Sequence, residues 1–468
     1  AAWASDLARE QRLAEQIVDA ILDGDPVTLT ADGQEFLGIY TESETEPPQG
    51  GTIILHGRGT HPDWSQVAGP LRTALPAHGW RTLSLQMPVL EKDSSYYDYA
   101  PVFPEAIPRI EAGIRYLQDQ GIKRIAGIQA PDNYLYDWPE LGTAEIDEQT
   151  MLRLHSDVRG VLDLEPASVR QRNREREPHS DCIDSWGSGQ TETSPGDWYP
   201  GVHPIPDART AEDLESYRGW PDMGDPSRIA HVKEQARLLA EQNQFAILAT
   251  PWLLFPFERA HAMQGMEVFL MNMAMDRDFA RALLEKIAVY CKQLMGPFLE
   301  QLGDNVDIIK IGDDLGTQES LMISPKMYRE ILKPVHADFI SFIKARTNAK
   351  VLFHSDGDVA PLIPDFIEIG VDILNPIQTS AGKMSDLATL KKHYGDNIVF
   401  CGGIDSHRIL PHGTVAEVRD EVRRVIQALG SGGGCMIGAV HTVMNDVPPE
   451  NVLAMVDAVE EFGYYPLK

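Results

Sequence analysis

The sequence predicts an α/β fold, in which a (β/α)8 barrel, or TIM barrel, over residues 130–468 follows a shorter parallel-sheet segment over residues 1–128. Apolar, strand-like runs alternate with amphipathic helical patterns, which is typical of parallel sheets. After residue 130 the alternation repeats many times with no glycine-rich phosphate fingerprint after the first strand, and this favours a barrel over a Rossmann sheet. Polar residues follow several predicted strands, where barrel enzymes carry their active sites.

Composition excludes some classes of partner. The chain has 468 residues and a formal net charge of −29, which disfavours nucleic acid and anionic membranes. A hydrophobic content of 43% is typical of a globular protein with a full core. No apolar run reaches the roughly 18 residues of a membrane span. The four cysteines lack C-x-x-C spacing, so we expect reduced thiols and a cytoplasmic location for the barrel.

The first segment alternates helices and strands in a regular order. Residues 6–23 have apolar positions at helical spacing, and residues 27–33 and 36–40 are typical of a hairpin. The remaining predicted elements are a strand over 52–57, a helix over 67–78, a strand over 81–87, a helix over 103–120 and a strand over 123–128.

Two stretches of this segment, LHGRGTHPDW at 55–64 and GWRTLSLQMP at 79–88, resemble the front half of α/β-hydrolase proteins, in particular an uncharacterised bacterial family of that fold. The resemblance implies an oxyanion-hole loop and a serine in G-x-S-x-G after the strand over 123–128. No such motif occurs in the chain, so we interpret His56 and His61 as structural. The change of pattern near residue 129 indicates a natural fusion with a degenerate first domain or a chimeric chain, and the first segment is compatible with an origin in an exported protein.

The second segment repeats strand and helix to its end. Predicted strands cover 134–138, 245–250, 306–312, 350–354, 371–375, 397–405 and 434–441. Predicted helices cover 147–155, 207–217, 226–242, 258–269, 277–302, 325–346, 359–370, 384–394, 415–429 and 448–462, while 165–230 is otherwise irregular.

Several of these strands end on chemically versatile side chains. His354 and Asp356 follow an apolar strand two residues apart, so both side chains face the same way. The other candidates lie at or just beyond the ends of predicted strands. They are Asp313, Asp314, Gln318, Asn375, Gln378, Asp405 and His441. Because the carboxyl ends of barrel strands meet at one face, the sequence predicts an active site there.

Motifs along 131–468 resemble the uroporphyrinogen decarboxylase superfamily, which includes corrinoid-linked methyltransferases. The matching stretches are PD at 131–132, SPKMY at 324–328, FHSDG at 353–357, IGVDILNP at 369–376, FCGGID at 400–405 and VPPENVLAM at 447–455. The resemblance implies a (β/α)8 barrel with its site at the strand ends. Porphyrinogen decarboxylases carry an arginine-rich motif near the start, but residues 135–143 contain no arginine, which argues against a substrate with many carboxylates.

The methyltransferase branch implies zinc held by His-x-Cys-Gly and a second cysteine. Carried onto this sequence, the ligand positions are His354, Asp356 and His441, so aspartate and histidine replace the two cysteines. This set is compatible with Zn²⁺ or another divalent metal. The resemblance also implies a corrinoid carried by a partner protein and a homodimer.

Two reactions and one inactive alternative remain open. The first reaction moves a methyl group from a small methylated substrate towards a corrinoid. The second is a decarboxylase-type lyase reaction on an acidic substrate, in which His354, Asp356, Asp314 and His441 serve as catalytic hydrogen-bond donors, acids or carboxylates. Asp313, Gln318, Asn375, Gln378 and Asp405 are the predicted substrate-binding residues. The third interpretation is a non-catalytic or chimeric chain with a degenerate hydrolase domain.

Overall fold

A computed structural model describes residues 5–57, 60–64, 68–90, 102–129, 148–174, 181–194, 197–251, 255–444 and 446–467. The chain forms two compact units, Ala1–Trp138 and Pro139–Lys468. The strand predicted over 134–138 and the motif at 131–132 lie outside the described residues. Among the helices that the structure describes, none is both long and apolar enough to cross a membrane.

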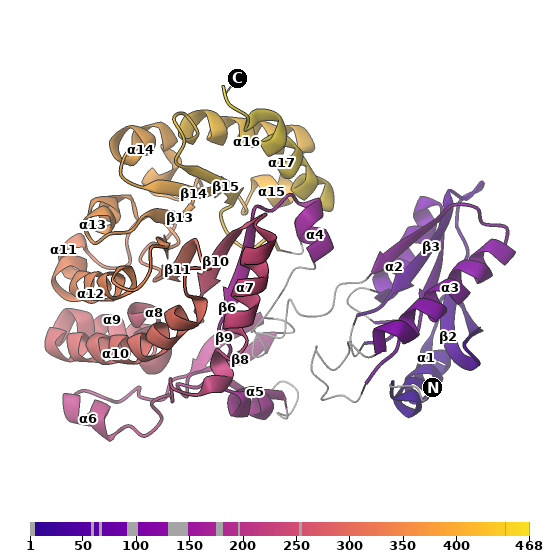
Figure 1. Cartoon of the computed structure of the whole chain (residues 1–468), viewed down its shortest axis with the longest axis horizontal. Coiled ribbons are helices and arrows are strands. Elements are labelled where there is room, and N and C mark those ends of the chain that lie inside the picture. Colours follow the sequence, from indigo (N-terminus) through magenta and orange to yellow (C-terminus); the bar gives the residue numbers. More distant parts are fainter. Residues whose placement is uncertain are drawn as a thin grey trace. The chain divides into compact units, whose positions relative to one another are not determined.

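The first unit is drawn in indigo to purple (Figure 1). It is built on a five-stranded mixed sheet in the order β1-β2-β4-β3-β5. Its elements are α1 (Leu7–Ala20), β1 (Asp25–Ala31), β2 (Gln34–Thr41), β3 (Gly50–Leu55), α2 (Ala68–Ala74), β4 (Trp80–Leu85), α3 (Phe103–Asp119) and β5 (Ile125–Gln129). Strands β4, β3 and β5 are parallel, as predicted for this segment, whereas β2 pairs antiparallel with both β1 and β4. The sheet is therefore mixed, because the predicted hairpin is part of it.

Alternation along β2 gives this sheet two covered faces. Phe36 and Tyr40 belong to a core that includes residues of α3, whereas Leu37 and Ile39 pack with Ile17 of α1. His56 is buried, and its Nε2 accepts a hydrogen bond from the Met87 amide at 2.9 Å. Burial lowers the pKa of His56 to about 3, so the ring is neutral and structural.

The second unit contains a seven-stranded parallel sheet in the order β15-β14-β13-β12-β11-β10-β6. The strands are β6 (Val158–Leu162), β10 (Ala246–Thr250), β11 (Ile308–Gly312), β12 (Lys350–His354), β13 (Ile373–Ile377), β14 (Val399–Ile404) and β15 (Cys435–Ala439). The predicted α/β barrel class is confirmed, with seven rather than eight strands in the sheet formed by the described residues. Sequence reasoning missed β6, the strand at one end of the row.

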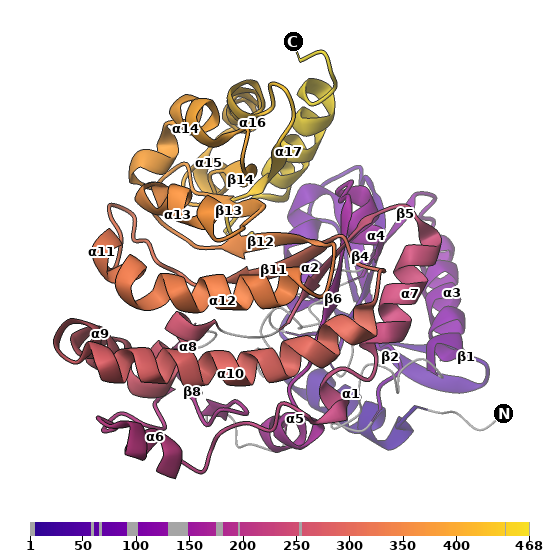
Figure 2. The ribbon, with the colours of Figure 1, turned by 60° about the vertical axis from the view of Figure 1, so that its left-hand side comes forward.

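Helices surround this sheet (Figures 1 and 2). They are α4 (Glu148–Arg153), α5 (Ala167–Arg174), α6 (Ala211–Ser216), α7 (Val232–Gln242), α8 (Pro256–Gln264), α9 (Met266–Met275), α10 (Arg277–Leu302), α11 (Pro325–Met327), α12 (Lys333–Lys344), α13 (Ile363–Glu368), α14 (Leu387–Tyr394), α15 (Ile409–His412), α16 (Val415–Leu429) and α17 (Pro449–Phe462). A π-helical turn, η6 (Tyr328–Leu332), joins α11 to α12.

Side-chain alternation separates an outer core from the barrel interior. Outward residues such as Ile309 and Phe353 join the large core that includes the buried faces of α10 and α12. Inward residues form a small apolar layer made of Ile308, Leu352 and Ile373, flanked by Leu248, Val399, Cys401 and Met436. The polar site residues follow further along the same strands.

Two expectations for this unit were wrong. The segment expected to be irregular contains a three-stranded antiparallel sheet of β7 (Cys182–Ile183), β8 (Gly189–Ser194) and β9 (Asp197–Val202). The helix predicted over 258–269 is interrupted at Gly265, whose φ of +87° suits glycine, and it continues as α9.

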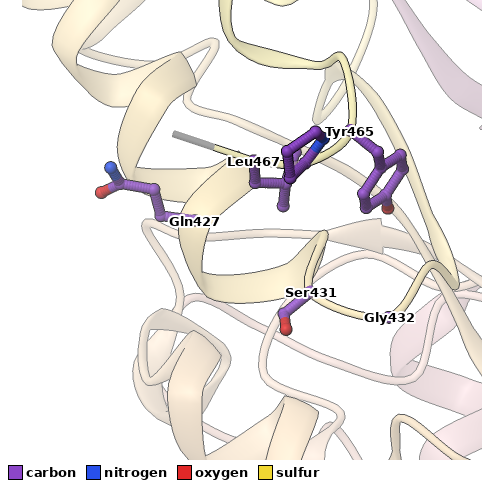
Figure 3. Close-up of a pocket in the computed structure, with 6 residues that line it drawn as sticks. Gln427, Ser431, Gly432, Tyr465 and Leu467 are labelled. Atoms are coloured by element: carbon purple, nitrogen blue, oxygen red, sulfur yellow. The ribbon is translucent and has the colours of Figure 1, made fainter.

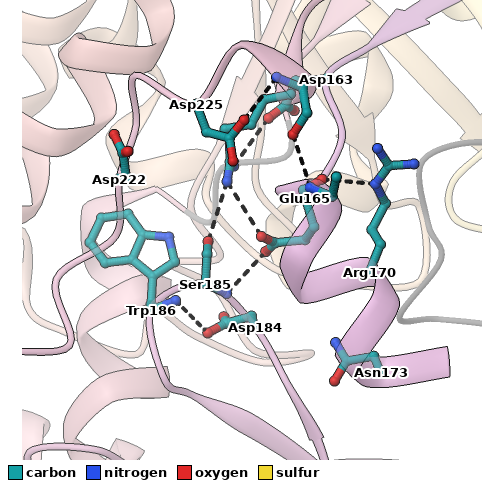
Figure 4. A network of polar contacts seen from close by, with 12 residues as sticks. Asp163, Glu165, Arg170, Asn173, Asp184, Ser185, Trp186, Asp222 and Asp225 are labelled. Carbon is teal, nitrogen blue, oxygen red and sulfur yellow. Dashed lines mark hydrogen bonds and ion pairs between the residues drawn. The ribbon is translucent and has the colours of Figure 1, made fainter. Parts of the chain in front are cut away.

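A buried polar network lies where β6 meets this small sheet. Arg228 is 1% exposed, and its guanidinium contacts Asp163 and Glu165 at 3.2 and 3.3 Å. It also donates to Ser185 Oγ at 3.3 Å. Figure 4 shows Asp163, Glu165 and Ser185, the side chains that converge on this guanidinium. The network joins the end of β6 to the loop that follows β7.

Candidate active site at the carboxyl ends of the strands

The loops after β11 and β12 pack backbone to backbone at the carboxyl ends of these strands. A Cβ on Gly357 would lie 2.4 Å from the carbonyl carbon of Gly316, so only glycine fits there. The Leu315 amide donates to Ser355 Oγ at 3.0 Å, and the Asp358 amide donates to the Thr317 carbonyl at 2.8 Å. These contacts hold the two loops in register beyond the sheet.

The paired loops bring Asp314, His354 and Asp356 together. His354 Nε2 lies 3.9 Å from Asp314 Oδ1 and 3.7 Å from Asp356 Oδ2. One ligand atom from each of the three residues lies within 4.8 Å of the other two. Asp314 Oδ1 also accepts the Asp356 amide at 2.8 Å, which fixes the first carboxylate against the second loop. The sequence predicted these three residues as catalytic, and the structure gathers them.

His441 approaches the same cluster from the segment after β15. Its Nε2 lies 3.6 Å from Asp356 Oδ2, and its ring centroid is 6.4 Å from that of His354. The side chain is 52% exposed, compared with 23% for His354. His441 therefore forms the open side of the cluster.

Asn375 orients the His354 ring instead of facing open space. His354 Nδ1 and Asn375 Oδ1 lie 2.7 Å apart, and because an amide oxygen only accepts, Nδ1 carries the proton. Asn375 Nδ2 lies 3.4 Å from Cys401 Sγ, which fits this amide orientation. This hydrogen bond turns Nε2 towards the carboxylates, as in a metal-binding histidine whose other ring nitrogen donates to a neighbouring oxygen.

Asp356 is held as a carboxylate. Burial raises the pKa of Asp356, but the interaction with His354 and the charges of His441 and His407 outweigh it, so the pKa lies below its ordinary value. His407 was not among the residues predicted for the site. Its place after β14 puts its charge within reach of this site.

Asp313 points away from the cluster into the protein. It is fully buried, and its carboxylate accepts the amides of Phe257 and Glu258 at 3.1 and 2.9 Å. His336 Nε2 donates to the same carboxylate at 2.8 Å. Burial raises the pKa of Asp313, while His336 and the two amides oppose this shift. The structure thus places this predicted substrate-binding residue as a cap for α8.

The other predicted substrate-binding residues have varied surroundings. Gln378 is buried, and its Oε1 accepts the Gly357 amide at 2.6 Å. Asp405 is buried and accepts the His407 amide at 2.8 Å. Gln318 has an exposed side chain, and its carbonyl accepts the Gly382 amide at 3.0 Å. Gln378 and Asp405 therefore shape the loops, and Gln318 lies at the rim.

Glu258, in the first turn of α8, was missed by sequence reasoning. Burial and the charges of Asp313, Asp314 and Asp356 raise the pKa of Glu258 well above its ordinary value, against the opposing charge of Arg259. Such surroundings favour the uncharged form of the carboxyl group over the carboxylate. No sequence motif marks this residue, because its neighbours come from other strands.

A pocket of about 400 Å³ lies elsewhere, between the segment before β15 and the end of the chain (Figure 3). Its lining includes Ser431, Gly432, Tyr465 and Leu467. Because Gly432 precedes β15, this pocket belongs to the amino-terminal end of the strands, opposite the cluster.

Comparison with known proteins defines the class of this chain. The family model described as uroporphyrinogen decarboxylase (URO-D) matches residues 196–462, which is more than half of the sequence. The chain therefore belongs to the URO-D family. A second model, described as a protein of unknown function (DUF3530), matches residues 6–105.

Individual relatives are distant. A uroporphyrinogen decarboxylase from Legionella pneumophila strain Philadelphia 1 is 25% identical over 246 residues, covering 51% of this chain and 65% of the relative. The enzyme of that name from Pseudoalteromonas translucida is 27% identical over 193 residues, covering 38% of this chain and 52% of the relative. The chain thus spans less than two thirds of these relatives. A methyltransferase structure from Methanosarcina mazei has a TM-score of 0.45 and 21% identity, with 60% of this chain and 77% of that chain covered.

Proposed function

We propose that this chain is an enzyme that transfers a methyl group from a small methylated substrate towards a corrinoid on a partner protein, assisted by a divalent metal. The observation that carries the proposal is the open set of two imidazoles and two carboxylates formed by Asp314, His354, Asp356 and His441. The family resemblance of these positions to a zinc-ligand motif supports the same function.

The donor set fits a metal. Ligand atoms bound at about 2.0–2.1 Å around a tetrahedral Zn²⁺ lie about 3.3–3.4 Å from one another. His354 lies 3.7 Å from Asp356 and 3.9 Å from Asp314, and His441 lies 3.6 Å from Asp356, so side-chain rotations would be needed to bring His354, Asp356 and a third donor onto one ion. His354 and Asp356 would be ligands with His441 or Asp314 as the third, which leaves a position for substrate.

The residues of the chain have distinct tasks in this reaction. A metal bound here would supply a Lewis acid for the oxygen or nitrogen that carries the methyl group. Asn375 holds His354 in the tautomer that presents Nε2. Glu258, whose raised pKa favours its protonated form, would donate a proton to the demethylated leaving group. The Gly316–Gly357 contact keeps both loops at this spacing.

Glu258 also favours a second candidate, a decarboxylase-type lyase on an acidic substrate. A protonated carboxyl group beside Asp314 and Asp356 would supply the proton that replaces lost CO₂ at carbon. The relatives named uroporphyrinogen decarboxylase support this candidate. It requires no metal.

Metal analysis of the purified chain, before and after dialysis against Zn²⁺, separates the two candidates. We expect about one equivalent of divalent metal per chain, lost in His354→Ala and in Asp356→Ala. The control is His393→Ala, because His393 lies exposed on α14 and its ring forms a hydrogen bond with the Thr389 carbonyl in the same helix. A wild-type chain that binds no metal in either preparation refutes metal-assisted transfer.

The reaction itself is tested with free cob(I)alamin and a panel of methyl ethers and methylated amines. Methyl transfer changes the corrinoid absorbance, and we expect this change only with wild-type chain and the His393→Ala control. Release of CO₂ from a carboxylated substrate, without corrinoid methylation, would favour the lyase instead.

A further inference from the structure

Lys310 lies inside the barrel, on the face of β11 that leads to the cluster. Side chains alternate along a strand, so Ile308, Lys310 and Gly312 share one face. Ile308 belongs to the inner apolar layer, whereas Ile309 and Ile311 pack in the outer core. The lysine side chain therefore points into the barrel.

The strand register places Lys310 directly below the cluster. Lys310 is paired with Leu352, and two residues further along Gly312 is paired with His354. Gly312 has no side chain, and a Cβ there would lie 2.5 Å from the His354 carbonyl oxygen. Strand β11 therefore places no side chain between the lysine and the polar cluster.

The Lys310 ammonium has no fixed partner in the described part of the chain. Among the residues that the structure describes, none forms a hydrogen bond or ion pair with its side chain. Lys310 is partly exposed although it lies mid-strand, so the interior is open beside it. An ammonium out of bulk water without hydrogen-bond acceptors is unfavourable for folding, which is typical of a residue kept for binding.

Burial and the neighbouring charges act on the pKa of Lys310 in opposite directions, and the net shift is downward. Burial lowers the pKa of Lys310, and the charges of Cys401, Asp356, Asp314 and Glu258 oppose this shift. The three carboxyl groups lie towards the end of the strands and the apolar layer lies below. The Lys310 ammonium therefore lies between the polar cluster and the inner apolar layer of the barrel.

We propose that Lys310 is a substrate-binding residue that pairs with the carboxylate of a small monocarboxylate held in the barrel interior. One ammonium without an arginine neighbour in the described interior suits a single negative charge better than a phosphate. The proposal deepens the proposed function, since it names the class of substrate at the same site. In methyl transfer the substrate is a methylated carboxylic acid, and in the lyase reaction it is the acid that loses CO₂.

Calorimetric titration of the full-length chain with acetate and with benzoate, at constant ionic strength and pH 7, tests this inference. We expect wild-type protein to bind at least one of them and Lys310→Met to weaken that binding at least tenfold. Lys310→Arg retains the charge and is expected to keep part of the affinity. Lys350→Met is the matched control, because Lys350 lies on the same face but at the exposed start of β12.

Thermal unfolding of Lys310→Met separates binding from folding. Removal of an unpartnered ammonium is expected to leave the melting temperature unchanged or higher. A clearly lower melting temperature identifies a structural lysine and overturns the proposal, as does unchanged binding in Lys310→Met or a wild-type chain that binds neither carboxylate. Metal content separates this proposal from metal-assisted transfer. If the wild-type chain holds no metal but Lys310→Met still weakens benzoate binding, metal-assisted transfer is refuted and the role of Lys310 in binding stands.

Discussion

Replacement of Asp313 by alanine should mainly reduce stability and replacement of Asp314 mainly metal binding, although the two residues are adjacent. Asp313 is fully buried and accepts three hydrogen bonds, from the amides of Phe257 and Glu258 and from His336. The first turn of α8 has no capping side chain of its own. Asp314 is 37% exposed and accepts one amide.

The magnitudes follow from these contacts. A hydrogen bond to a charged group contributes about 1.5–3 kcal/mol, and bonds that share one carboxylate are not additive. We expect Asp313→Ala to lower the free energy of unfolding by about 4 kcal/mol, and Asp314→Ala by about 1 kcal/mol. For a unit spanning Pro139–Lys468, an unfolding entropy of about 2.1 cal/mol/K per residue gives melting shifts of about 6 °C and about 1.5 °C.

Differential scanning calorimetry of the full chain measures these shifts, and metal analysis of the same samples measures the site. Asp313→Asn keeps one acceptor oxygen and should lie between wild type and Asp313→Ala. Asp314→Ala should reduce metal content with little thermal change. If Asp314→Ala melts at a lower temperature than Asp313→Ala, the assignment of Asp313 as the cap of α8 is wrong.

Three further predictions concern Glu258, Arg228 and Gly357. Because the pKa of Glu258 is raised, the folded chain binds this proton more tightly than the unfolded chain does. The free energy of unfolding should therefore fall as pH rises from the unfolded pKa of about 4.3 to the folded pKa. Glu258→Gln should reduce the fall of the free energy of unfolding with pH, as measured by urea titrations at several pH values. An equal pH dependence in wild type and Glu258→Gln would exclude the Glu258 carboxyl group as its source. Arg228→Met removes the guanidinium that contacts the buried Asp163 and the partly buried Glu165, and should lower the free energy of unfolding by about 3–5 kcal/mol; a loss below about 1 kcal/mol in urea would contradict this network. Gly357→Ala should lower both the melting temperature and metal content, because its φ is +86° and a Cβ would strike Gly316; the control Gly160→Ala meets nothing within 4 Å and should change neither.

The sequence predicts those features that depend on local pattern. The period of two along β12 predicts that His354 and Asp356 face the same way, and the structure places them 3.7 Å apart. The predicted bounds of α10 match because Asp276 caps its start and Gly303 follows its end. The barrel class follows from the repeated alternation of strand and helix.

Features that depend on distant neighbours could not be predicted. Strands β7–β9 are short and rich in glycine and polar residues, so their pairing leaves little pattern. Adjacent aspartates are chemically identical in sequence, and only packing against α8 shows that Asp313 is turned inward. Glu258 and Lys310 acquire their character from burial and from charges that other segments bring close in the fold.

The contact between Gly316 and Gly357 shows that the groups that hold the two loops together differ from the side chains that form the cluster. Backbone atoms and buried side chains such as Ser355 and Gln378 hold the two loops, whereas the side chains of Asp314, Asp356 and His441 project beyond them. Those projecting residues are free to change during divergence without dismantling the loops. We therefore expect the same two loops to carry either carboxylate and imidazole ligands or thiolate ligands. Asp356→Cys combined with His441→Cys should convert the proposed ligand set into one with two thiolates.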